Sequence, residues 1–306
     1  MPNLIKPHEQ FPALPLSDWA QTKETLHLLT QIIGKIRLTY HPKLNHWWHV
    51  TLYPSARGLT TGMIPYEERH FEILFDFIDH QLQIQTSDGD TRQFFIPGIS
   101  VSEFYEKIME AMRSLNMPVK IYAKPYLHPT SDIPFSQDTR HCTYDPEAVH
   151  RYWQILAWIA EIFQEFRGRF LGKSTPVQLY WHSFDLVVTR FSGKKAPPRT
   201  TGTKVDKEAY SHEVISFGFW PGDLKFQEPA FYSYTYPSPN GLTKAPLRPD
   251  IAFWGQTNGN DMALMRYEEF RQQPDPRQAL LDFLESAYQA GALKAQWPVE
   301  DLAVIS

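Results

Sequence analysis

Two segments in the second half of the chain carry side chains that could take part in acid–base chemistry. Alternation from residue 179 to 188 predicts a strand on which His182 faces apolar neighbours and Asp185 points to the other side. Because an imidazole has a pKa near neutrality, His182 could take up and release a proton, with Asp185 as an orienting carboxylate. The alternative is a core histidine that is hydrogen-bonded to a backbone carbonyl.

A second pair of titratable residues, His212 and Glu213, begins another predicted strand. Glu213 shares a face of this strand with large apolar side chains, so it lies either at the wet end of the strand or buried beside a partner. Burial would raise the pKa of its carboxyl unless a cation or a hydrogen-bond donor compensated. The predicted catalytic set therefore draws on both strands and consists of His182, His212, Glu213 and Asp185.

Aromatic and basic residues near these strands are candidates for lining a ligand pocket. Arg190 lies at the end of the predicted strand that contains His182, and it could bind an anionic group of a ligand. It could equally hydrogen-bond to a backbone carbonyl or pair with an acidic residue. Residues 193–208 hold five basic side chains and two prolines, which predicts a mobile basic loop that could close over a site. The predicted ligand-binding residues are Trp48, His49, Trp181, Arg190 and Tyr210.

The sequence lacks the motifs of several common sites. It has no paired cysteines, no H-E-x-x-H and no calcium-type loop, and His46 and His49 would face opposite sides of a strand, so no metal site is predicted. Cys142 follows His141, but a linker position argues against an ordered nucleophilic site there. Residues 168–174 end in Gly-Lys-Ser without the earlier glycine of a phosphate loop, and the sequence leaves any cofactor unknown.

The elements that must position these residues follow from capping and periodicity. Ser100 with Glu103 forms a capping box, and Asp-Pro pairs at 145–146 and 275–276 are typical helix starts. Apolar spacing predicts helices over 18–35 and 100–115 and after each Asp-Pro pair. Alternation predicts strands at 46–53, 71–77, 81–85, 91–96 and 119–123, and near 177–190, 211–219, 230–236, 250–254 and 262–266.

Both halves have the order helix, about four antiparallel strands, helix, which predicts an α+β fold with helices on one face of each antiparallel sheet. A short motif also recurs, because Trp47-Trp48-His49 is echoed by Tyr180-Trp181-His182. We interpret the pattern as an internal duplication into two pseudo-repeated units. The predicted domains are 1–124 and 146–306, joined by a Pro-rich linker at 125–145, or one compact pseudo-symmetric domain.

Composition limits the partners and the location. With 306 residues and 14% aromatic residues, the chain can bury a large core rich in rings. A net charge of −4 argues against nucleic acid as a partner, and no apolar run approaches the roughly 18 residues of a membrane span. A single cysteine and residues 1–10 without a secretory apolar region predict a cytoplasmic protein, as either a monomer or a homodimer.

Segments spread along the chain carry a family resemblance: Leu28–Lys35, Asn45–Val50, Ala56–Thr61, Ser183–Leu186, Thr189–Gly193, Tyr210–Glu213 and Phe219–Gly222. In these segments the chain resembles a bacterial family that is catalogued as a domain of unknown function and is common in soil bacteria and cyanobacteria. The resemblance covers nearly the whole chain. It implies a bacterial cytoplasmic protein with one continuous architecture, and it implies no activity or catalytic residue.

Three functions are compatible with these residues. The first is an enzyme that uses His/Glu acid–base chemistry on a small, partly aromatic or apolar molecule in an aromatic-lined pocket between the halves. The second is a ligand-binding protein that uses the same pocket without catalysis. The third is a structural or interaction module in which the aromatic residues form the core and an exposed sheet face recruits a protein partner.

Overall fold

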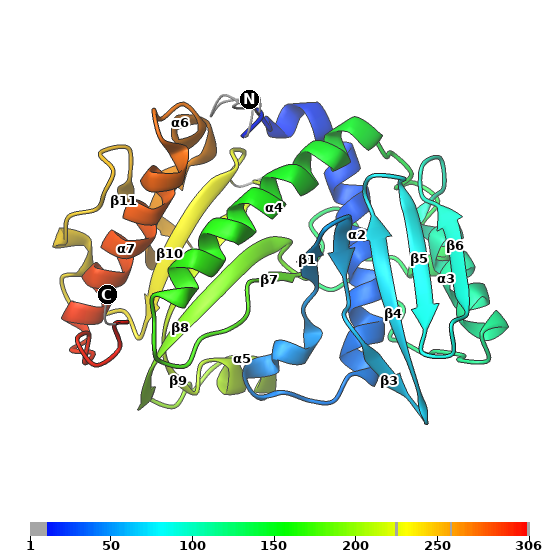
Figure 1. Ribbon diagram of the computed structural model, residues 1–306, viewed down its shortest axis with the longest axis horizontal. Helices are drawn as coiled ribbons and strands as arrows, with labels where there is room; N and C mark the ends of the chain where they lie inside the picture. The colour runs from blue at the N-terminus through cyan, green and yellow to red at the C-terminus, as the bar shows by residue number, and fades with distance from the viewer. Residues whose placement is uncertain (1–10, 224–225, 258, 305–306) are drawn as a thin grey trace, which may run out of the picture.

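The chain forms two antiparallel β-sheets with helices packed against them, which confirms the predicted α+β class. A computed structural model describes residues 11–223, 226–257 and 259–304. Residues 1–10, for which the sequence predicts no secretory segment, lie outside this description. Figure 1 shows the two sheets side by side, with α4 crossing in front of the second sheet and α3 behind the first.

The first sheet is built from the N-terminal half. Its longest strand, β4 (Arg69–Asp76), buries Phe71, Ile73 and Phe75, as the period-two pattern predicts. The strands follow the spatial order β1-β2-β4-β5-β6, and β3 also pairs with β4. The remaining strands are β1 (Tyr53–Ser55), β2 (Gly58–Thr60), β3 (Ile64–Tyr66), β5 (Gln81–Thr86) and β6 (Thr91–Phe95).

The second sheet is built from the C-terminal half and follows the order β11-β12-β10-β9-β8-β7. Its centre is formed by the long antiparallel strands β8 (Asp185–Lys195), β9 (His212–Trp220) and β10 (Ala230–Tyr236). The remaining strands are β7 (Gln178–Tyr180), β11 (Phe253–Thr257) and β12 (Asn260–Arg266).

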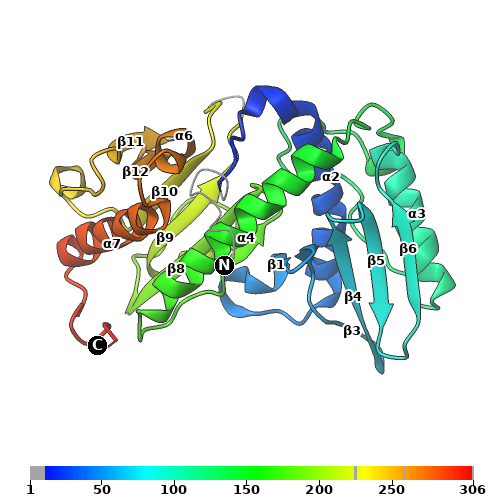
Figure 2. The same ribbon diagram turned by 45° about the horizontal axis from the view of Figure 1, so that its top comes forward.

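Among the described residues, four long helices cover the sheets, as Figures 1 and 2 show. α4 (Pro146–Gly168) and α7 (Pro276–Lys294) pack on one face of the second sheet, which we call its inner face. α2 (Leu16–Tyr40) and α3 (Val101–Ser114) pack against each other beside the first sheet. The short helices are η1 (Asn45–Val50), η2 (Phe135–Gln137), α5 (Lys204–Ala209), η3 (Leu242–Lys244) and α6 (Tyr267–Arg271).

The predicted helix starts are confirmed by their capping hydrogen bonds. Asp145 accepts from the backbone N–H groups of Glu147 and Ala148 at 2.9 and 3.3 Å, which satisfies two donors that α4 itself cannot pair. Asp275 caps α7 by the same chemistry. Ser100 and Glu103 form the predicted capping box at the start of α3.

Two predicted strands are wrong at positions that matter for the site. Residues 45–50 form the 3-10 helix η1, because His46 and Trp47 have left-handed φ angles of 54° and 62° that no strand can accommodate. His182 lies in the turn between β7 and β8, where Phe184 N–H donates to the Tyr180 carbonyl at 2.7 Å. The short strand predicted at 119–123 is also absent from the described residues, which are irregular there.

The predicted duplication stays a prediction. Both halves contain an antiparallel sheet flanked by long helices. The echoed motifs, however, adopt different structures, because Trp47-Trp48-His49 lies within η1 whereas Tyr180-Trp181-His182 runs from the end of β7 into a turn.

The halves share one continuous apolar core. Buried residues from α2, both sheets, α4 and α7 belong to a single cluster, and Leu52 and Leu179 form a backbone bridge between the halves with N···O distances of 2.9 and 2.8 Å. Segment 125–145 is packed into this body, because Phe135 and Asp138 within it are fully buried. None of the described helices combines the length and apolar character needed to cross a membrane.

Candidate functional site

The outer face of the second sheet, opposite α4 and α7, gathers the titratable and aromatic side chains that could do chemistry. Alternation along the paired strands places Asp185 and Phe191 of β8, His212 of β9, and Tyr232 and Tyr234 of β10 on this face. Two short elements, η1 and α5, contact each other and bring further side chains to it. The face therefore combines residues from both halves of the chain.

His46 is the residue that η1 contributes to this face. Its left-handed backbone and that of Trp47 are unfavourable by about 1–3 kcal/mol each, so they persist only where the surroundings enforce them. The His46 Nδ1 lies 3.2 Å from the carbonyl oxygen of Ala209, so Nδ1 carries the proton and Nε2 keeps its lone pair. Burial, and then the nearby positive charge of Lys173, lower the pKa of His46 below its ordinary value. The ring is therefore a neutral base at neutral pH.

A second imidazole and two aromatic rings surround His46. The ring centroid of His46 lies 5.5 Å from that of His212 in an edge-to-face arrangement and 4.7 Å from that of Phe191. We call His46 and His212 the imidazole pair. Trp48 lies 5.7 Å from His46, and the ammonium of Lys173 lies 5.1 Å from the ring centroids of both Trp48 and Phe191. The pair thus lies between apolar walls with one cation beside it.

A row of phenol groups continues from the imidazole pair along the same face. The hydroxyls of Tyr210 and Tyr234 lie 2.9 Å apart, and Tyr232 donates its hydroxyl proton to Asp185. Asp185 also accepts from Ser183 Oγ at 2.5 Å, so its carboxylate is held by two donors. Burial raises the pKa of both Tyr232 and Tyr234 well above the ordinary tyrosine value. These phenols remain protonated hydrogen-bond donors at neutral pH.

An irregularity in the sheet shapes the end of the face nearest the imidazole pair. The pairing of β8 with β9 shifts register between Phe191 and Lys195, and Gly193 in this interval has a left-handed φ of 87°. Lys195 is paired with His212 beyond the irregularity. Bulges of this kind redirect side chains at sheet edges, and here the irregularity lies directly beside His212.

Four of the residues predicted from the sequence meet on this face: Trp48, Asp185, Tyr210 and His212. A fifth, His182, lies in the adjoining turn, where its ring centroid is 5.3 Å from that of Tyr180. Burial lowers the pKa of His182, and the charge of Asp185 opposes that shift.

The other predicted residues point elsewhere. Glu213 lies on the inner face and accepts from Ser192 Oγ at 2.8 Å. Arg190 is 1% exposed, and its guanidinium carbon lies 3.5 Å from the ring centroid of Phe166, so the predicted anion clamp is out of a ligand's reach. Burial lowers the pKa of Arg190 to about 10. His49 and Trp181 are buried as well, and Trp181 donates from Nε1 to a backbone carbonyl at 2.5 Å.

Sequence reasoning missed His46, Lys173 and the phenols of β10. The phenols carry a readable signal, because Tyr232, Tyr234 and Tyr236 alternate with smaller residues and so must share one face of a strand. For His46 the strand interpretation was misleading, because residues 45–50 form the 3-10 helix η1, in which His46 and Trp47 have left-handed backbones. Within the described ranges, no three His, Cys, Asp or Glu side chains are placed to hold a metal ion.

A separate cluster of polar side chains connects segment 125–145 to α2 through hydrogen bonds. His141 Nδ1 lies 2.8 Å from the buried carboxylate of Asp138, and His141 Nε2 lies 3.2 Å from the Thr130 hydroxyl. The same hydroxyl donates to Glu24 of α2 at 3.1 Å. These hydrogen bonds order the segment around His141, while Cys142 beside it is exposed.

The comparisons with known proteins identify the family. A model described as a family of unknown function (DUF5996) matches residues 11–304, which is nearly the whole chain. The chain therefore belongs to this family. No curated protein and no solved structure matches it.

Proposed function

We propose that this member of the DUF5996 family is an enzyme that transfers protons to and from a small, anionic, partly aromatic ligand on the outer face of its second sheet. The observation that carries the proposal is the imidazole pair, in which His46 from one half and His212 from the other lie with ring centroids 5.5 Å apart beside Lys173. His46, a neutral imidazole between apolar walls, is suited to general acid–base catalysis near neutral pH.

Each group on the face has a chemical role in this proposal. His46 Nε2 accepts a proton from a carbon next to a ligand carbonyl. The electron pair of the broken C–H bond forms a C=C bond, and the π electron pair of the carbonyl moves to its oxygen. That developing oxyanion accepts a hydrogen bond from the Tyr210–Tyr234 pair, since two hydroxyls sharing one hydrogen bond have a second proton to donate. His212 serves as the second acid–base group, and Asp185 fixes the orientation of Tyr232.

The surroundings favour an anionic ligand with an apolar portion. Trp48 and Phe191 supply flat apolar walls, and Lys173 lies over both rings. Arg199 lies 4.8 Å from the ring centroid of Tyr210 in the phenol row. A carboxylate near either cation would orient the ligand, while the apolar portion packs between the rings.

Solvent deuterium exchange tests the proposal without knowledge of the natural substrate. Levulinate, 2-oxobutanoate and 3-benzoylpropionate each carry a carboxylate and a C–H group next to a ketone, and exchange in D2O is followed by proton NMR. We expect the protein to accelerate exchange of at least one compound. His46→Gln should lower that acceleration by about 10²–10⁴-fold, the usual contribution of a general base.

A histidine on the first sheet, away from the outer face of the second sheet, provides the control. His70→Gln changes a half-buried histidine of β4 on the first sheet and should leave exchange unchanged. Equal acceleration by wild type and His46→Gln would rule out His46 as the base. Binding of these anions to the outer face without any exchange would instead support a ligand-binding protein that does no chemistry.

A further inference from the structure

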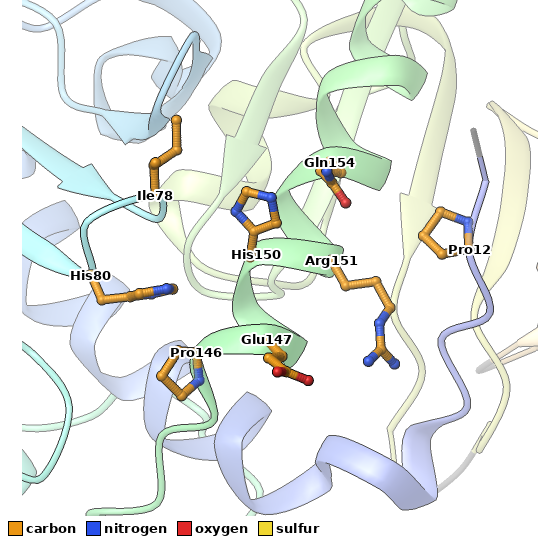
Figure 3. Close-up of a pocket in the computed structure, with 8 residues that line it drawn as sticks. All are labelled: Pro12, Ile78, His80, Pro146, Glu147, His150, Arg151 and Gln154. Carbon is orange, nitrogen blue, oxygen red and sulfur yellow. The ribbon is translucent and has the colours of Figure 1, made fainter. Parts of the chain in front are cut away.

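A groove between the two halves lies apart from the outer face and has a volume of about 440 Å³. One wall is the turn after β4, which carries His80, and the other is the first turns of α4, which carry Glu147, His150, Arg151 and Gln154 (Figure 3). This volume falls in the range of small-molecule sites, roughly 300–1,000 Å³. The groove shares no residue with the site described above.

The groove contains two histidine side chains, and in each of them Nδ1 is hydrogen-bonded to another group of the protein. His150 Nδ1 lies 3.2 Å from the carbonyl oxygen of Phe77, so Nδ1 carries a proton and donates it to that carbonyl. His80 Nδ1 lies 3.1 Å from the hydroxyl of Tyr144. Burial, and then the proximity of His150, lower the pKa of His80. The His80 ring is therefore neutral at neutral pH, and Nε2 of His150 is the ring nitrogen left for a ligand.

The charged groups of the groove are one carboxylate and one guanidinium. Glu147 and Arg151 are one helical turn apart on α4, a spacing at which such residues commonly pair with each other. Across the described ranges neither side chain forms an ion pair or a side-chain hydrogen bond, and Figure 3 shows both extending from the same side of the helix. The groove thus offers opposite charges side by side with no net charge.

We infer that this groove binds a small α-amino acid with a hydrogen-bond donor in its side chain. Arg151 would pair with the carboxylate, Glu147 would accept from the ammonium, and His150 Nε2 would accept from the ligand's side chain. A zwitterion matches the neutral sum of the groove's charges, whereas a simple anion or amine would leave one protein charge uncompensated. The inference is independent of the chemistry proposed for the outer face.

Calorimetric titration of the full chain with L-serine and L-asparagine tests the inference, with sulfate and ethanolamine as probes that carry charge of one sign only. We expect at least one amino acid to bind at least tenfold more tightly than either of these two probes. Arg151→Gln and Glu147→Gln should each weaken that binding by about tenfold, as expected for the loss of a charged hydrogen bond. Lys107→Gln and Glu106→Gln are matched controls, because they neutralise exposed charges on α3.

Each contrary outcome is distinct. Failure of both amino acids to bind overturns the inference. Sulfate binding as tight as that of an amino acid makes the groove an anion site, which also overturns it. Binding that survives both groove substitutions places the amino acid elsewhere. Because Glu147 is exposed and Arg151 half-buried, the variants should fold normally, which a circular dichroism spectrum checks.

Discussion

Acidification should destabilise the protein through His128, whose side chain is buried between segment 125–145 and α2. Its ring centroid lies 4.7 Å from that of His27, and its Nδ1 accepts from the Thr130 backbone N–H at 3.3 Å. Burial lowers the pKa of His128 from 6.5 to about 4, and the charge of Glu24 only partly opposes this. Burial also lowers the pKa of His27 well below 6.5.

The sign and size of the effect follow from these pKa values. Between pH 6.5 and about 4 the unfolded chain protonates His128 while the folded protein does not, so the unfolded state binds more protons. The contribution of His128 to stability is therefore complete above pH 6.5 and is lost as the pH falls toward 4. At about 1.4 kcal/mol per pKa unit, that loss amounts to about 3 kcal/mol.

Urea unfolding at a series of pH values measures this loss. The wild-type free energy of unfolding should fall steeply from pH 6.5 to 4, and His128→Gln should flatten the fall by about 3 kcal/mol, since glutamine does not titrate. His70→Gln should keep the wild-type pH dependence. An unchanged fall in His128→Gln would refute the assignment of the acid sensitivity to this buried ring.

Three further substitutions test the packing. Gly34→Ala should lower the free energy of unfolding in urea by about 1–3 kcal/mol, because the alanine Cβ would lie 2.1 Å from Trp181 Cδ1. A variant as stable as the wild type would contradict this. Asp145→Ala should lower the free energy of unfolding by about 1 kcal/mol through loss of the α4 cap, and no change would contradict the cap. Arg190→Met should lower the melting temperature less than Arg190→Ala does, because methionine fills the same space against Phe166 without a buried charge. Equal decreases in melting temperature would contradict this packing role.

Local chemistry explains which parts of the fold could be predicted. The starts of α3, α4 and α7 were predictable because capping depends on a few adjacent residues, such as Asp145 before a proline. The central strands of the second sheet were predictable because alternating burial leaves a period of two in the sequence. These signals also placed His212 and Asp185 on strands, which is why both reach the same face.

The parts that could not be predicted depend on tertiary contacts. The left-handed backbone of His46 has no periodic signal, so alternation predicted a strand at 46–53 where the 3-10 helix η1 forms. The turn at His182 was hidden because Phe184 adopts a left-handed φ of 61° without a glycine. Segment 125–145 has a linker's composition, and the burial of Phe135 and the hydrogen bonds of Asp138 with Ser131 and His141 order it.

The central claim is that His46 and His212 form one acid–base site. Side-chain nitrogen NMR of protein labelled with ¹⁵N-histidine tests it most directly, read while a compound that undergoes exchange is titrated in. The account predicts a His46 tautomer protonated on Nδ1, and chemical-shift changes at His46 and His212 but not at His70. Shifts confined to other histidines, or an unperturbed imidazole pair during exchange, would contradict it.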